Sequence, residues 1–135
     1  MRFADRERGF VAIEWVTAVA LLLFPVVVLV ATMPTWAERR HAATVAAREG
    51  AAAAVAGDTV DPAAARAVAT EVAARYGIGA DAVTVEVEAT GGRRGYVTVL
   101  VHVQMPAIAV PGLAEVGGWT YTARQHRRLD DYRSL

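Results

Sequence analysis

The feature that most constrains this chain is a long uncharged stretch near its N-terminus. From Trp15 to Ala37 the sequence reads WVTAVALLLFPVVVLVATMPTWA and holds no charged residue. A helix needs about 20 apolar residues to cross the hydrocarbon core of a bilayer. Apolar residues on every side of a helix are typical of a membrane span or of the centre of a large core. Because 135 residues are too few to bury such a helix all round, we predict a single-pass transmembrane helix over residues 10–35.

Two prolines and the flanking charges refine this prediction. Pro25 lies inside the span and removes a backbone donor, so we expect a helix kink there. Pro34 is either a break between the span and a following helix or a position at which a kinked helix continues.

Arginines flank both ends of the span almost evenly. Since the segment before the span is only a short tail, we expect a cytoplasmic N-terminus and an exported C-terminal part.

The composition outside the span excludes several classes of function. Basic and acidic residues number 14 each, so the chain lacks the positive surplus of a nucleic-acid-binding protein, and we predict no nucleic-acid partner. The absence of cysteine excludes disulfides and thiolate metal sites. His41, His102 and His126 are far apart in the sequence, and no catalytic pattern accompanies them. We therefore expect no enzymatic activity, no metal and no cofactor.

A carboxylate lies at the inner edge of the span. Residues 8–15 read RGFVAIEW, which places Glu14 where an ordinary signal anchor would be apolar. A carboxylate in the hydrocarbon region costs a few kcal/mol, less near the interface, and is by default a sign of function. The alternative is that Glu14 lies in the headgroup layer and extends toward water. Gly9 precedes Phe10, Glu14 is the fifth residue counted from Phe10, and a short charged leader comes before them.

This arrangement resembles the class III signal sequence of type IV prepilins and pseudopilins. The resemblance implies that a membrane-embedded prepilin peptidase removes leader residues 1–9, cleaving between Gly9 and Phe10. It also implies that Glu14 stays in the helix. There its carboxylate can pair with the Phe10 α-amine of a neighbouring subunit and help to fix the register between subunits.

Within that family, the chain is most similar to the Tad (Flp-type) group, and specifically to TadE-like minor pilins. These carry a short leader, one N-terminal span and a small exported α+β part. Their processing motif has Glu followed by Tyr or Phe, whereas here Trp15 follows Glu14. The resemblance implies a structural subunit of a surface pilus used in tight adherence or secretion. The implied partners are other pilin subunits through the N-terminal helix, the prepilin peptidase, platform membrane proteins and the lipid bilayer.

Two other interpretations stay open at this point. The first is an unprocessed signal anchor that carries an exported binding domain, for which Gly9 and Glu14 would have no special role. The second is a secreted protein whose signal is removed by the general signal peptidase near Ala37.

Residues 36–135 form the predicted exported domain, which begins with helices. An alanine-rich helix is expected over residues 36–56, ended by Gly57, because alanine is the best helix former. We interpret the run 51–54 as part of a plain surface helix rather than a close-packing face. A second helix is expected to begin at Asp61 and Pro62, which suit the N-cap and the first helical position, and to stop at Gly77.

Beyond Gly77 the apolar residues repeat every second position, which indicates strands. Val83, Val85 and Val87 alternate with polar residues, and the same alternation runs from Val97 to Val103. The glycine-rich segment 91–95, with a solvated Arg93–Arg94 pair, joins the two strands as a hairpin. A connection rich in proline and glycine leads to a third strand over residues 119–127, with Trp119, Tyr121 and Ala123 on one face. The expected fold is therefore α+β and pilin-like: a long N-terminal transmembrane helix that continues into a soluble helix, a second helix and a small antiparallel sheet of two to three strands.

Overall fold

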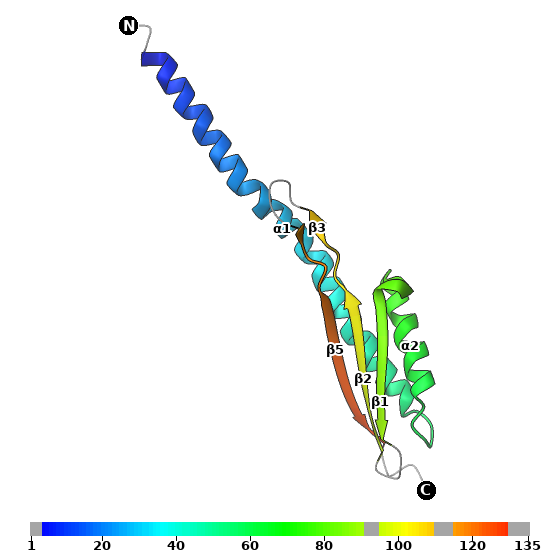
Figure 1. The fold of residues 1–135 in the computed structure, drawn as a ribbon. Coiled ribbons are helices and arrows are strands. Elements are labelled where there is room, and N and C mark those ends of the chain that lie inside the picture. The colour runs from blue at the N-terminus through cyan, green and yellow to red at the C-terminus, as the bar shows by residue number, and fades with distance from the viewer. Residues whose placement is uncertain (1–3, 91–94, 110–114, 130–135) are drawn as a thin grey trace.

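A computed structural model describes residues 4–90, 95–109 and 115–129, with the backbone alone described for residues 4–10. The fold is α+β and opens with one very long helix, α1 (Ala4–Ala54), followed by α2 (Pro62–Arg75) and a short 3-10 turn, η1 (Ala80–Ala82). The strands follow in the order β1 (Val83–Thr90), β2 (Tyr96–Gln104), β3 (Ile108–Ala109), β4 (Glu115–Val116) and β5 (Thr120–Arg128). The N-terminal half of α1 projects away from all the other elements (Figure 1).

Helix α1 continues unbroken through both prolines. Pro25 and Pro34 lie inside its 51 residues, so of the two alternatives for Pro34 the continuing helix is the one observed. The kink expected at Pro25 stays a prediction. The C-terminal part of α1 packs on α2, β2 and β5, and it ends at Ala54, slightly before the expected Ala56.

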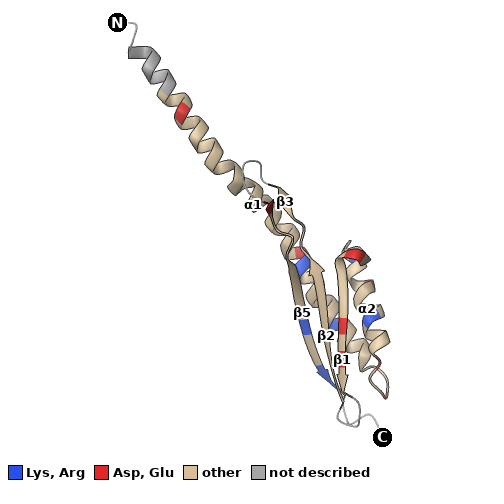
Figure 2. Ribbon diagram, viewed as in Figure 1, with Lys and Arg blue, Asp and Glu red and all other residues tan. Residues whose placement is uncertain are grey.

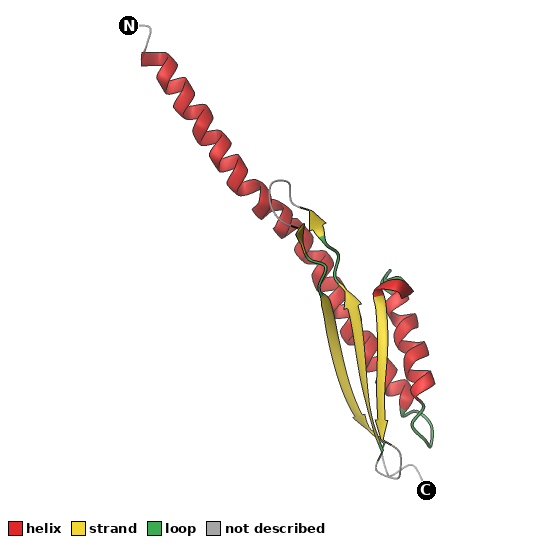
Figure 3. Cartoon of the chain, viewed as in Figure 1, coloured by secondary structure: helices red, strands yellow, loops and turns green. Residues whose placement is uncertain are grey.

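The three-stranded sheet has the order β1-β2-β5, with both pairings antiparallel. The first two strands form the predicted hairpin, and its register joins Val83 to Val103 and Thr90 to Tyr96. Residues 91–94, which include the predicted Arg93–Arg94 turn, lie outside the described residues. The C-terminal part of α1 and helix α2 lie along the sheet (Figure 3).

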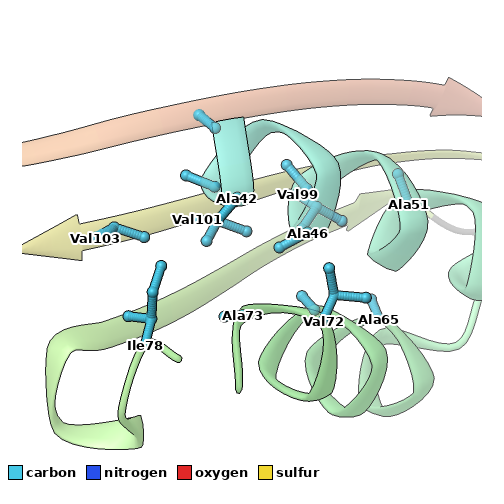
Figure 4. Packing of buried hydrophobic residues seen from close by; sticks show 14 of the residues in the cluster. Ala42, Ala46, Ala51, Ala65, Val72, Ala73, Ile78, Val99, Val101 and Val103 are labelled. Carbon is cyan, nitrogen blue, oxygen red and sulfur yellow. The ribbon is translucent and has the colours of Figure 1, made fainter. Parts of the chain in front are cut away.

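The core lies between the inner face of β2 and the two helices (Figure 4). Its largest fully buried side chains are the four alternate valines of the central strand: Val97, Val99, Val101 and Val103. The helices meet them with small side chains. On α1 the buried alanines are Ala42, Ala43, Ala46, Ala47, Ala51 and Ala54. Small residues on both helices let the backbones approach closely, so the core is thin and rich in alanine and valine.

The run 51–54 corrects the sequence analysis. Ala51 and Ala54 are fully buried and belong to the core, so the interpretation as a plain surface helix was wrong and the close-packing alternative is right. The neighbouring Gly50 shows why. A Cβ atom added there would lie 2.9 Å from the Ala65 carbonyl oxygen and 3.1 Å from the Ala69 Cβ. Helix α1 therefore touches α2 at this point too closely for any side chain at residue 50.

Helix α2 begins and ends where local signals predicted. The Asp61 side chain accepts hydrogen bonds from the backbone N–H groups of Ala63 and Ala64, at 2.9 and 3.1 Å. Gly77 adopts a φ of +73° and donates its N–H to the Ala74 carbonyl at 2.9 Å. This left-handed conformation strains any residue with a Cβ, so glycine suits the helix C-terminus here.

The segment between β2 and β5 also differs from the prediction. It was expected to be a connection rich in proline and glycine, and no strand was predicted in it, but Ile108 and Ala109 pair with Val116 and Glu115 as a small antiparallel ladder, β3–β4. The pairing of Met105 N–H with the Trp119 carbonyl, at 2.9 Å, extends the β2–β5 contact toward this ladder. Two-residue strands in a segment rich in proline and glycine give no alternation that a sequence pattern can reveal.

Candidate assembly site on the N-terminal helix

The projecting half of α1 exposes a large apolar surface. Every side chain from Val11 to Phe24 is exposed in the isolated chain, with Trp15 at 69% and Leu21 at 78%. Burying one such large side chain is worth about 1.5–3 kcal/mol, and apolar patches of this extent mark membrane or protein contacts. A helix at the centre of a large core is therefore excluded. This long, apolar N-terminal helix indicates membrane anchoring or export.

Glu14 is the only charged residue between Val11 and Ala37. In Figure 2 the described part of the projecting helix is tan apart from one acidic band. The Glu14 side chain is exposed, and no ion pair or hydrogen bond joins it to another described side chain. The next charged residue, Glu38, follows 24 positions later, a distance of about 36 Å along a helix. A carboxylate therefore marks the start of an apolar segment long enough to cross a bilayer.

The predicted processing residues lie in the helical backbone. Gly9 and Phe10 are within α1, which begins at Ala4, and the structure describes only their backbone. A peptide bond inside a helix cannot be presented as an extended chain until the first turns open. Gly9 lowers the cost of that opening, because glycine in a helix is less stable than alanine by roughly 0.5–1 kcal/mol. Four residue steps separate Phe10 from Glu14, about 6 Å along the axis.

The other end of the apolar segment is attached to the sheet domain by four contacts that the sequence analysis missed. The indole rings of Trp36 and Trp119 lie 4.8 Å apart between centroids, and Trp36 Nε1 donates to the Pro106 carbonyl at 3.4 Å. Arg39 donates to the Gln104 carbonyl at 2.8 Å. The Arg40 guanidinium lies over the Tyr121 ring, 5.6 Å from its centroid, in a cation–π geometry.

These contacts could not be found from the sequence. Aromatic and arginine side chains near the end of a span are expected in any case as interfacial anchors. Their partners lie 65 to 70 positions later for Arg39 and Trp36, and only the strand register brings them together.

The outward face of the sheet carries the histidines of the strands. His102 Nδ1 lies 2.7 Å from the Thr122 hydroxyl, and its Nε2 lies 3.6 Å from a Glu86 carboxylate oxygen. His126 Nδ1 lies 3.1 Å from the Thr98 hydroxyl. These are cross-strand pairs on a face that the alternation predicts to be polar. Among the described residues, no three His, Asp or Glu side chains are close enough together to hold a metal ion.

An open groove lies between α1 and α2, with a volume of about 610 Å³. It is lined by Val45, Glu49, Val68, Glu71, Val72, Arg75 and Tyr76. Glu71 and Arg75, one helical turn apart on α2, form an exposed ion pair of 2.6 Å at its edge. No cluster of nucleophile and base lines this groove, so the exposed apolar helix with Glu14 is the stronger candidate for function.

Comparisons with known proteins add no relative: no family model, no curated protein and no solved structure matches this chain. The resemblance to pilins is thus carried by the residues from Gly9 to Trp15 and by the order of elements.

Proposed function

We propose that this chain is a structural pilus subunit, a TadE-like minor pilin or pseudopilin that a prepilin peptidase processes after Gly9. The observation that carries the proposal is the combination on α1. Helix α1 is apolar and largely exposed over a membrane-spanning length, holds Glu14 near the start of that apolar segment, and continues without a break into the core of a small α+β domain.

Glu14 is the residue on which assembly depends in this proposal. Cleavage leaves a charged α-amine on Phe10 at the end of an apolar helix, and such a group is costly to remove from water without a partner. Glu14 has no partner among the described side chains of its own chain. When subunits pack through their helices, the Glu14 carboxylate of one subunit pairs with the Phe10 amine of the next. A pair in an apolar surrounding specifies register, as buried polar groups do in some coiled coils.

The unbroken helix transmits this register to the exported domain. Helix α1 spans 51 residues, about 75 Å, and its C-terminal alanines form part of the core. Positioning the N-terminal half therefore positions the sheet as well. In this proposal the partners are other pilin subunits, the prepilin peptidase, platform membrane proteins and the bilayer. The N-terminus is cytoplasmic, the domain is exported, and the chain has no enzymatic role.

The test compares Glu14→Gln with Glu38→Gln, which also removes an exposed glutamate from α1 but lies beyond the apolar segment. Both variants are expected to reach the membrane of the native host and to lose their leader. We expect only Glu14→Gln to be missing from filaments sheared off the cell surface. Equal amounts of both variants in the sheared fraction would contradict the role of Glu14 in assembly.

A second candidate is an unprocessed anchor that carries an exported domain. The helical backbone at Gly9 and Phe10 favours it, because a helical peptide bond resists cleavage. A secreted protein cut near Ala37 is less well supported. That cut would remove Trp36, which packs on Trp119 and donates a hydrogen bond to the Pro106 carbonyl. The secreted domain would therefore lose both of these contacts.

A further inference from the structure

A small apolar hairpin lies beside the end of the exposed helix. The juxtamembrane hairpin is defined here as β3, β4 and Trp119. Strand β2 runs toward the N-terminal end of α1, and β3 continues in that direction beyond the main sheet (Figure 1). Trp36 shows which part of α1 lies beside the hairpin, because its side chain contacts both Pro106 and Trp119.

The hairpin reaches back along the apolar segment. Ile108 is two residues beyond Pro106, at most about 7 Å for an extended chain. At 1.5 Å per helix residue, the same distance along α1 covers about four to five residues. Ile108 therefore lies between the level of Trp36 and that of Ala31 and Thr32, beside the uncharged stretch that ends at Ala37.

The residues of the hairpin are mostly apolar, which suits a position beside the end of the apolar segment of α1. Between Met105 and Trp119 the sequence has one charged residue, Glu115. Val116 is 37% exposed and Trp119 is 45% exposed, on the side of the domain nearest the span. The surface of α1 becomes charged after Trp36, where Arg39 and Arg40 follow.

From these observations we infer that the juxtamembrane hairpin is a second membrane-contacting element, which enters the outer headgroup and acyl boundary of the bilayer beside α1. Amphipathic helices at an interface bury their apolar faces about 5–10 Å into this boundary, and the reach of the hairpin beyond Pro106 is of the same order. The β3–β4 ladder pairs its own backbone groups, and headgroups and water can satisfy the others. Tryptophans at the headgroup level complete the arrangement.

The partner is lipid because the hairpin continues the surface that α1 already exposes. Met33, which is 57% exposed, lies in the part of α1 that reaches the same level. A bilayer that surrounds the end of the helix must meet the hairpin as well. The inference rests on the proposed membrane span, but it does not depend on leader processing or pilus assembly.

The test uses the absence of cysteine, which allows a spin label to be placed at one site in the full chain. The labelled variants are Val116→Cys in the hairpin, Leu22→Cys in the span and Glu88→Cys on the outer face of the sheet. Each is reconstituted in phosphatidylcholine vesicles. Collision rates are measured with oxygen, which concentrates in lipid, and with a nickel chelate, which stays in water.

We expect the oxygen-to-nickel collision ratio at Val116→Cys to exceed that at Glu88→Cys several-fold, and to be lower than at Leu22→Cys. A ratio at Val116→Cys equal to that at Glu88→Cys, with Leu22→Cys still high, overturns the hairpin inference alone. Low collision rates with both reagents at Val116→Cys also overturn it, because they indicate a contact with a second copy. A low ratio at Leu22→Cys refutes the span, and the inference falls with it.

Discussion

The close contact between α1 and α2 at Gly50 predicts that Gly50→Ala has the opposite of the usual effect of replacing glycine by alanine in a helix. Replacing glycine by alanine inside a helix normally stabilises it by about 1 kcal/mol. At Gly50 the new Cβ would lie 2.9 Å from the Ala65 carbonyl oxygen and 3.1 Å from the Ala69 Cβ. Neither atom belongs to a flexible side-chain end, so the two helices must separate.

The net effect follows from two opposing contributions. Overpacking a well-packed core costs typically 1–3 kcal/mol, which offsets the gain in helix propensity. We expect Gly50→Ala to lower the free energy of unfolding by up to about 2 kcal/mol. Gly50→Val should lower it further, because its γ-carbons extend into α2. For a domain of about 100 residues, 1 kcal/mol corresponds to a fall in Tm of roughly 4–8 °C.

The assay is thermal unfolding of the full chain in detergent micelles, followed by near-UV circular dichroism. Gly57→Ala is the matched control, because its Cβ would meet only the Thr59 carbonyl oxygen at 3.8 Å. We expect its Tm to stay close to that of the unmodified chain. A rise in Tm for Gly50→Ala, or a fall equal to that of Gly57→Ala, would refute the close-packing explanation.

Two further predictions concern the same domain and use the same assay. Asp61→Ala removes the acceptor of two backbone hydrogen bonds and should destabilise the domain by about 0.5–2 kcal/mol; an unchanged Tm would show that solvent replaces this cap. Val101→Thr buries a hydroxyl at a fully buried position and should cost about 1–3 kcal/mol. Its control, Thr84→Val on the exposed face of β1, should have little effect, and comparable losses in both variants would place the core on the wrong face of the sheet.

The local elements could be predicted because each has a signal within a few residues. Asp61 followed by Pro62 specifies the start of α2, and Gly77 its end. Alternation from Val97 to Val103 gives both the strand and its buried face. The order of these signals, with the uncharged stretch before them, gives the α+β class.

Features that depend on distant parts of the chain could not be predicted in this way. Ala51 and Ala54 look like any surface alanines until α2 is placed against them. Leu100 lies on the outward face, yet it is 8% exposed because the register places it between Glu86 and Arg124, whose aliphatic stems can cover it.

The candidate site also has a part that the sequence predicts and a part that depends on tertiary structure. Glu14 at the edge of an uncharged stretch can be recognised from the sequence, because a carboxylate in an apolar span is costly whatever the tertiary structure. Trp36 could be identified as an interfacial residue, but its contact with Trp119 depends on tertiary structure. The juxtamembrane hairpin had no sequence signal beyond its low charge, with Glu115 as the one charged residue between Met105 and Trp119.

The central claim is that Phe10 becomes the N-terminus of the mature subunit. The most direct measurement is the N-terminal sequence and intact mass of the protein recovered from native-host membranes, beside a Gly9→Leu variant. The account predicts a chain that starts at Phe10 and a Gly9→Leu variant that keeps residues 1–9. A chain that keeps its leader in both forms would contradict the account and leave an unprocessed anchor. A start near Glu38 would instead identify a secreted domain.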